Sequence, residues 1–365
     1  MKKFFILTTL FLVTSLFSQT ATAPSGTGTL CDPYLISSLD NLYWITQNPS
    51  SYGVGKNFVQ TANIDASPTS TWNSGAGFPA IGTFQAKYNG AGYTISGLVI
   101  NTTGGNRGIF GYLNNATLEN LTISSPNVSF TSGGSNGILA GISANSTITN
   151  VKIIGGSFSY SGSSGYDFAN SGFIGDVWGS TITSCSTSAS VTSNRLMTGG
   201  FVGRILGAST FTKCSVSSTL NITAGTSRIG LFAGQTEHSS GIVTFNQCNA
   251  SGSITAVSGS GLIGGFIGLC FGNINFNNCF ASVNLPNISG SNGFWGGLWS
   301  ANTATNTVTF NNCYSIGSVP NSFSGGFGNS ASTTFTYSNC FWDTQTSGKS
   351  NGLYGSNASG LSGKT

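Results

Sequence analysis

One position in this chain recurs eight times at intervals of 27 to 34 residues, and it is always apolar or cysteine. This closing column consists of Leu121, Val151, Cys185, Cys214, Cys248, Cys279, Cys313 and Cys340. Self-similarity at such a period indicates a repeat protein, in which each repeat is one structural unit and the stacked units share a continuous core. Because the intervals vary, loops of different length must lie outside the segment that stays in register.

The residues just before each closing position keep a fixed pattern. Three positions upstream the residue is apolar or aromatic: Leu118, Ile148, Ile182, Phe211, Phe245, Phe276, Phe310 and Tyr337. One position upstream Asn is commonest, in the series Asn120, Asn150, Ser184, Lys213, Gln247, Asn278, Asn312 and Asn339. Side chains alternate between faces along a strand, so two inward residues three positions apart require a bend between them. Asn tolerates the left-handed backbone of a tight bend, and stacked Asn side chains can hydrogen-bond to one another.

The other half of each repeat places glycine beside an apolar pair, as in Phe201-Val202-Gly203 and Phe266-Ile267-Gly268. Each repeat then supplies a glycine-rich strand, a Thr/Asn-rich strand ending at the bend, and a short strand after the closing position. Three strands separated by bends make one coil of a parallel β-solenoid. The period is too short for a propeller blade, and a sandwich or barrel would show hairpin turns without one column maintained across all the repeats.

Two of the repeats read GGFVGRILGASTFTKCSVSS and GGFIGLCFGNINFNNCFASVNL, the last contains CFWDTQTSG, and GTGTLCDPYLISSLDNLYWI precedes the first. These phrases resemble the GLUG-motif repeats of bacterial secreted and surface proteins, with their entry segment and their last repeat. The resemblance covers most of the chain after the first 23 residues. It implies a right-handed parallel β-helix and an extracytoplasmic, often adhesin-like protein, but no particular ligand or reaction.

The predicted fold is therefore all-β, a right-handed parallel β-helix of about 8–9 coils with an N-terminal cap that contains one short helix. Lys2 and Lys3 precede an apolar stretch at 4–17 and a small-residue site at 21–23, so 1–23 is predicted to be a signal peptide. Residues 24–100 should form the cap and first solenoid strands, with a helix that begins at Ser38 and stops at Pro49. Residues 101–345 carry the GLUG-like repeats. Residues 346–365 form a Gly/Ser-rich tail, and we expect the native chain to continue beyond it.

Charge is sparse in this chain. Only 5% of residues are charged, and loss of Lys2 and Lys3 with the signal peptide takes the formal charge from +4 to +2. Binding to nucleic acid needs clustered Lys and Arg, whereas the arginines here fall in different repeats. We therefore predict a secreted or bacterial cell-surface protein with no nucleic-acid partner and no membrane-spanning segment after signal removal. Its oligomeric state is left open.

Eight cysteines in an exported protein ordinarily indicate four disulfides. Six of them lie in the closing column, where side chains of neighbouring coils point in parallel directions and a buried thiol behaves as a small apolar group. This geometry favours free buried thiols, with disulfides between coils as the alternative. Zinc binding does not fit, because the cysteines are one coil apart and His238 is the only histidine. No metal or cofactor is predicted.

Few groups are available for catalysis. The best acidic pairings are Asp167 with Asp176, nine residues apart in one repeat, and Glu237 beside His238. We expect both to lie in loops as solvated charges, because isolated surface charges are the default. A Ser-His-Asp triad would need His238, and no nucleophile-elbow sequence accompanies it. The sequence favours a binding role over catalysis.

An uncharged polar strip flanks the inward residues. Four positions before the closing column stand Thr117, Thr147, Thr181, Thr210, Thr244, Asn275, Thr309 and Thr336, and two positions before it stand Glu119, Thr149, Thr183, Thr212, Asn246, Asn277, Asn311 and Ser338. Thr favours strands, and stacked hydroxyls and amides satisfy one another on any solenoid face, so the strip has an ordinary structural explanation. It could also dock a glycan, or contact ice as the threonine arrays of β-helical antifreeze proteins do.

Aromatic side chains can provide stacking platforms for sugars, and Trp178, expected beside Asp176 in a loop, is the candidate for such a platform. The candidate ligand-binding residues are Trp178, Asp176, Thr147, Thr149, Thr181, Thr183, Thr210 and Thr212. The predicted function is a secreted or cell-surface binding or structural module, adhesin-like, with a glycan or another cell surface as partner. A polysaccharide lyase or hydrolase is the first alternative, and an ice-binding protein is the second.

Overall fold

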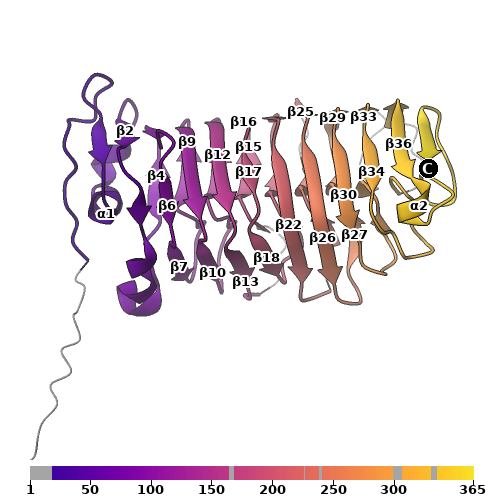
Figure 1. Cartoon of the computed structure of the whole chain (residues 1–365), viewed down its shortest axis with the longest axis horizontal. Coiled ribbons are helices and arrows are strands. Elements are labelled where there is room, and N and C mark those ends of the chain that lie inside the picture. Colours follow the sequence, from indigo (N-terminus) through magenta and orange to yellow (C-terminus); the bar gives the residue numbers. More distant parts are fainter. Residues whose placement is uncertain (1–18, 164–167, 226, 238–240, 299–305, 330–334) are drawn as a thin grey trace, which may run out of the picture.

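The computed structural model describes residues 19–163, 168–225, 227–237, 241–298, 306–329 and 335–365. The strands stack along one long axis into a β-solenoid of about nine turns (Figure 1). All pairings between the named strands are parallel, which confirms the all-β parallel solenoid predicted from the repeats. The predicted signal peptide falls mostly on residues 1–18, outside the described residues.

Three sheets build the solenoid, and the coils that contain a sheet C strand pass from sheet C to sheet B and then to sheet A. Sheet C is five-stranded: β14 (Ala169–Ser171), β19 (Met197–Gly199), β23 (Ser227–Gly230), β27 (Gly261–Gly264) and β31 (Ser291–Asn292). Sheet B is eight-stranded: β4 (Ile81–Phe84), β8 (Phe110–Asn114), β11 (Ala140–Ala144), β15 (Ile174–Trp178), β20 (Val202–Ile205), β24 (Ala233–Thr236), β28 (Ile267–Cys270) and β32 (Trp295–Leu298).

Sheet A has 24 strands and wraps around the rest of the coil. Its first face contains β1 (Tyr34–Ile36), β2 (Asn57–Gln60), β5 (Lys87–Asn89), β9 (Thr117–Ser124), β12 (Thr147–Ile154), β16 (Thr181–Thr183), β21 (Thr210–Thr212), β25 (Ile242–Asn246), β29 (Asn273–Asn277), β33 (Val308–Asn311) and β35 (Phe335–Ser338). After the bend follow β3 (Ile64–Asp65), β6 (Thr94–Ser96), β17 (Ser186–Thr187), β22 (Ser215–Ile222), β26 (Asn249–Ala256), β30 (Phe280–Asn284), β34 (Tyr314–Ile316), β36 (Cys340–Asp343) and β37 (Leu361–Lys364). The remaining strands are β7 (Val99–Thr102), β10 (Asn127–Phe130), β13 (Ser157–Tyr160) and β18 (Ser190–Ser193).

The bend predicted before the closing column is present in all eight repeats. The residue one position upstream has a φ between 52° and 55° in every case, whether it is Asn, Ser, Lys or Gln. The side chains of Asn150 and Asn120 are hydrogen-bonded at 2.9 Å, and those of Asn312 and Asn278 at 3.1 Å. The left-handed turn therefore brings both flanking residues to the inside, as the spacing requires.

Two aromatic ladders fill the core. Phe173, Phe201, Phe232, Phe266, Phe294 and Phe327 stack with ring centroids 4.5–5.0 Å apart. Phe211, Phe245, Phe276, Phe310 and Tyr337 stack at 4.9–5.1 Å. Along 245–310 the rings of one ladder meet those of the other edge to face, at 85–90°. Aromatic pairs favour both geometries, so the repeat phrase stabilises the solenoid along and across its axis.

The glycines of the apolar phrase let sheets B and C approach closely. A Cβ on Gly203 would lie 2.6 Å from the Cβ of Ala169, and one on Gly268 would lie 2.3 Å from the backbone nitrogen of Ile229. Both distances are shorter than a carbon contact allows. The phrase is therefore required where the chain leaves sheet C and turns back along sheet B.

The six cysteines of the closing column are buried, and all eight cysteines are free, which confirms the interpretation as buried thiols. Each column Sγ lies 3.3–3.6 Å from the carbonyl oxygen of the inward residue one coil earlier. Burial raises the pKa of the Cys185, Cys248 and Cys270 thiols. These side chains pack as small apolar groups that also donate weak hydrogen bonds.

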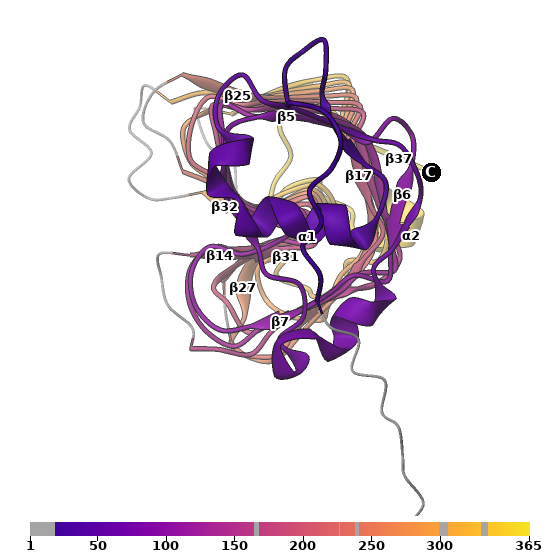
Figure 2. The ribbon, with the colours of Figure 1, turned by 90° about the vertical axis from the view of Figure 1, so that its left-hand side faces the viewer.

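The predicted cap helix is α1 (Leu39–Gln47), with Ser38 as its N-cap. The Ser38 hydroxyl accepts a hydrogen bond from the Asn41 backbone nitrogen, and Leu42 and Ile45 are buried. Two 3-10 segments, η1 (Pro49–Tyr52) and η2 (Ser67–Gly75), complete the cap. Figure 2 shows α1 lying across the N-terminal end of the solenoid. At the other end α2 (Thr344–Ser347) follows β36, and β37 pairs with β36, so part of the Gly/Ser-rich segment adds a further strand.

Candidate functional site

The polar strip predicted from the sequence lies in register on the first face of sheet A. Thr147, Thr181 and Thr210 are direct partners on adjacent strands, as are Thr149, Thr183 and Thr212. The same register continues through Thr244 and Asn246 to the last repeats. Figure 1 shows the strands β12, β16, β25, β29 and β33 side by side along the solenoid. The candidate threonines therefore form two parallel rows over three coils, which we call the threonine patch.

The threonine hydroxyls of the patch contrast with the asparagines of the strip, which bond to one another. None of the six threonines makes a side-chain hydrogen bond with a described residue. In later coils the strip satisfies itself: Asn277 donates to Asn246 at 2.9 Å, and Asn311 donates to Asn277 at 3.0 Å. Hydroxyls that face solvent without a protein partner are free to bond to a ligand.

The patch has a regular spacing and no charge. Adjacent coils of a parallel sheet lie about 4.8 Å apart, and alternate residues of one strand about 6.6 Å apart. Thr147 and Thr181 are exposed and the other four threonines are half-buried. Glu119, one coil before the patch, forms an ion pair with Lys87 at 2.7 Å. The patch is thus a neutral, nearly flat array of hydroxyl and methyl groups.

Asp176 and Trp178 are not in a loop, which corrects the expectation of solvated loop charges for Asp176. Both belong to β15, where their side chains share one face, and the chain turns towards β16 only at Gly179 and Ser180. Asp176 is 3% exposed, whereas Trp178 is 49% exposed. A strand continues there because Val177, between them, fills the core. Trp178 is therefore a surface aromatic at the corner between sheet B and the threonine patch.

Asp176 is held by an ion pair that crosses coils. Its Oδ2 lies 2.8 Å from Arg204 Nη2, its Oδ1 accepts from Arg204 Nε at 3.1 Å, and the Ser135 hydroxyl donates to Oδ2 at 2.6 Å. Burial raises the pKa of Asp176, and the hydrogen bonds from Arg204 oppose that shift. Arg204 Nη1 also lies 3.6 Å from Glu237 Oε2, so two carboxylates converge on one guanidinium.

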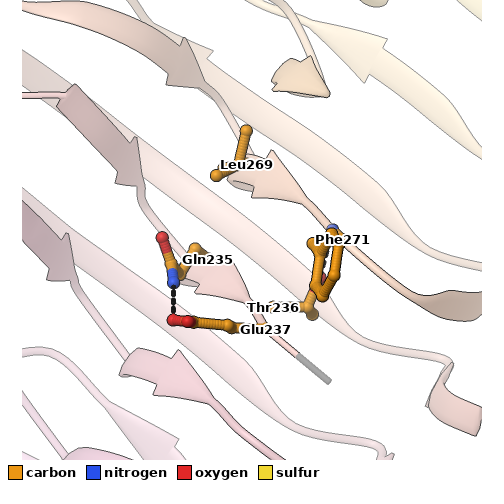
Figure 3. A pocket seen from close by; sticks show the side chains of 5 residues that line it. All are labelled: Gln235, Thr236, Glu237, Leu269 and Phe271. Atoms are coloured by element: carbon orange, nitrogen blue, oxygen red, sulfur yellow. Dashed lines mark hydrogen bonds between the residues drawn. The ribbon is translucent and has the colours of Figure 1, made fainter. Parts of the chain in front are cut away.

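A cavity adjoins this cluster on sheet B. Its volume is about 130 Å³, and Gln235, Thr236, Glu237, Leu269 and Phe271 line it (Figure 3). Gln235 Nε2 donates to Glu237 Oε2 at 2.6 Å, while Gln235 Oε1 is buried without a hydrogen-bond donor among the described residues. In Figure 3 the amide nitrogen of Gln235 points to Glu237 and its oxygen points the opposite way.

The sequence reasoning missed this cluster, although its signal was present. Asp176, Arg204 and Gln235 each follow the glycine of the apolar phrase, and they are register partners on β15, β20 and β24. Aligning the phrases FIGDVW, FVGRIL and FAGQTE superposes the three residues. The pairing of Asp176 with Asp167, and of Glu237 with His238, falls on residues 167 and 238, outside the described residues.

Two further observations concern the described part of the chain. It contains no group of three or more His, Cys, Asp or Glu side chains placed to hold a metal ion. No helix in it is both long and apolar enough to cross a membrane.

Comparisons with known proteins show a β-helical fold. No family model matches the chain. Halomucin from Haloquadratum walsbyi is 40% identical over 139 residues, which make up 36% of this chain and 2% of halomucin. A candidate immunoglobulin A1 protease from Bacteroides ovatus superposes with a TM-score of 0.57 at 21% identity, over 79% of this chain and 85% of that one. An IgA1 protease superposes with a TM-score of 0.54 at 16% identity, over 78% and 22%. At these identities the structural likeness concerns the fold alone, and the GLUG assignment stays a prediction.

Proposed function

We propose that this chain is a secreted or cell-surface binding module of the GLUG type, adhesin-like, that docks a neutral glycan on the threonine patch. The observation that carries the proposal is the set of six in-register threonines whose hydroxyls have no side-chain hydrogen-bond partner among the described residues. The predicted signal peptide and the similarity to halomucin support an extracytoplasmic location.

The chemistry of the patch suits a polyhydroxylated ligand. A hydroxyl both donates and accepts, so a row of threonines can match sugar hydroxyls whatever their orientation. The absence of charge in the patch favours neutral over acidic sugars. Trp178, half exposed at the corner beside β16, offers an aromatic face against which a sugar ring can stack.

A glycan array probed with residues 24–365 tests the proposal. Thr181→Val with Thr183→Val keeps shape and strand propensity but removes two hydroxyls. We expect the double variant to weaken binding about tenfold, since a net hydrogen bond contributes about 0.5–1.5 kcal/mol. Trp178→Ala should weaken it by a similar factor. Thr192→Val, on the half-buried Thr192 of β18, is the matched control and should leave binding unchanged. Absence of binding to every glycan, or equal losses in the control, would contradict the proposal.

Ice is a second candidate ligand, because the same threonine array repeats at about 4.8 Å along the solenoid and about 6.6 Å across it. Thermal hysteresis and crystal shaping by the purified protein, both reduced in the Thr181→Val/Thr183→Val variant, would support ice binding. Their absence at high protein concentration would exclude it.

The convergence of Asp176 and Glu237 on Arg204 favours a third possibility, a polysaccharide lyase or hydrolase. General acid–base catalysis needs a carboxyl group within reach of substrate, and Glu237, with its side chain 48% exposed, is the accessible one. Release of reducing or unsaturated sugar ends, abolished by Glu237→Gln, would support catalysis. Products that are formed equally by the variant would rule out this site.

A further inference from the structure

The cavity beside Glu237 has dimensions and a lining that define a class of ligand. At about 130 Å³ it is close to the roughly 150 Å³ of an apolar cavity that holds a benzene ring. It therefore admits a chain of a few heavy atoms and is too small for a whole oligosaccharide. It lies on sheet B, separate from the threonine patch on sheet A, so the inference does not depend on the proposed glycan site.

The Gln235 and Glu237 oxygens are acceptors at the cavity, and the Thr236 hydroxyl, which also lines it, accepts from the Phe271 backbone nitrogen at 2.9 Å. Gln235 is 1% exposed, and because a carboxylate can only accept, its hydrogen bond to Glu237 fixes the amide with Nε2 towards Glu237. Gln235 Oε1 is then left as a buried acceptor without a donor. Buried polar groups are nearly always paired, so an unpaired one at a cavity wall indicates a missing donor.

The charge balance favours a cationic donor. Asp176 and Arg204 form a bidentate pair that is neutral as a unit, and Glu237 adds a second carboxylate at 3.6 Å from the guanidinium. The three groups together carry a formal charge of −1. A ligand that brings one positive charge and several N–H groups would donate to Gln235 Oε1 and balance the charge of the Glu237 carboxylate.

The remaining wall is apolar. Leu269 is buried and Phe271 is half-buried at the opposite side of the cavity. Methylene groups pack favourably against such a wall, and an aromatic face attracts an ammonium ion.

We propose that this cavity, the Gln235–Glu237 pocket, binds a primary alkylammonium group, namely the side chain of a lysine on a partner protein. The lysine methylenes lie along Leu269 and Phe271, its Nζ donates to Gln235 Oε1, and the carboxylate of Glu237, bonded to the other side of the same amide, supplies the opposite charge. The Asp176–Arg204 pair positions Glu237 and does not contact the ligand.

Titration of residues 24–365 with Nα-acetyl-lysine methylamide, followed by NMR chemical shifts or calorimetry, tests the pocket. We expect saturable binding that weakens at least tenfold when the side-chain nitrogen is acetylated or replaced by the methyl group of norleucine. Glu237→Gln should weaken binding at least fivefold. Glu119→Gln removes a carboxylate on sheet A and should leave the affinity for the lysine amide unchanged. Thermal melting of each variant shows that it is folded.

The competing outcomes overturn the proposal. Equal affinity for the norleucine analogue would show that the ammonium is not recognised. Tighter binding of glucosamine than of the lysine amide would assign the pocket to an amino sugar. No saturation at millimolar ligand, or an unchanged affinity in Glu237→Gln, would exclude lysine as the ligand of this cavity. None of these results bears on glycan binding at the threonine patch.

Discussion

At the bend before each closing position one residue holds a left-handed backbone, and the eight residues there suit it unequally. Asn is one of the few non-glycine residues that tolerates this region, whereas Lys213 and Gln247 hold it at a steric cost of about 1–2 kcal/mol. The Asn residues also bond across coils. The residues one position before the closing column therefore combine a local backbone preference with contacts that exist only once the coils have stacked.

Asn312 is the best test of this combination, because it bonds to Asn278 at 3.1 Å and accepts from Asn339 at 3.2 Å. Asn312→Ala loses both bonds and places Ala at φ 53°, so we expect a loss of about 2 kcal/mol of unfolding free energy. Asn312→Gly keeps a residue that tolerates the left-handed backbone, so it should lose less unfolding free energy than Asn312→Ala. Urea unfolding measures both variants, with Ser217→Ala as an exposed control. A larger loss for Gly than for Ala would contradict the left-handed constraint.

Arg204 compensates a carboxylate that burial would otherwise penalise. Arg204→Met should cost about 3 kcal/mol at neutral pH, because it leaves Asp176 charged and unpaired. Burial already raises the pKa of Asp176, and loss of Arg204 raises it further. A raised pKa means that the stability linked to this group is present below its ordinary pKa of about 4 and is lost as the pH rises through the folded pKa.

The Arg204→Met loss should therefore shrink as the pH falls towards 4, and Asp176→Asn added to Arg204→Met should recover most of it at pH 7. Thermal melting of the single and double variants between pH 4 and 8 gives the comparison. A loss that is independent of pH, or a double variant no more stable than the single one, would show that Arg204 acts through packing.

Among the elements, the six cysteines of the closing column, which we call the cysteine ladder, pack as small apolar groups. Burial removes the six column thiols from solvent, so a reagent cannot reach them while the coils stay stacked. Under native conditions we expect one thiol per chain, the exposed Cys31, to react with a disulfide reagent, and all eight to react in denaturant. Cys31→Ser should then react with none. Rapid native reaction of a second thiol would contradict the burial of the ladder.

The elements also show where sequence reasoning succeeds. The closing column, the bends, the buried thiols and the start of α1 at Ser38 were predictable, because each depends on residues close together in the chain or at a constant repeat position. Asp176 was misplaced because its partner Arg204 is 28 residues away in the next coil. A carboxylate that follows Gly175 and comes shortly before Gly179 and Ser180 resembles a loop residue until the coils are aligned. The unpaired Gln235 oxygen depends on side-chain orientation, which no repeat pattern reveals.

At the scale of the whole molecule, a solenoid has two terminal coils whose strands have an unpaired side, and such strands can pair with another chain. The N-terminal end is covered by α1, which lies across it in Figure 2 and buries Leu42 and Ile45 against the core. Figure 1 shows the interior coils stacked beyond that end, each with a neighbouring coil on both sides. The cap therefore contributes to solubility as well as to stability.

Undocking α1 tests that role. Leu42→Asp with Ile45→Asp places two carboxylates in the apolar interface, where an unpaired charge costs several kcal/mol, so α1 should detach and expose the first coil. We expect concentration-dependent oligomers by light scattering and a lower melting temperature. Gln47→Asp, at the exposed last residue of α1, is the matched control and should keep the oligomeric state and melting temperature of the parent protein. Because the interior coils pair fully with one another, circular dichroism of the double variant should keep its strand signal. A variant that loses that signal would show that α1 nucleates the solenoid, and one that keeps the parent's oligomeric state and melting temperature would show that the first coil needs no cover.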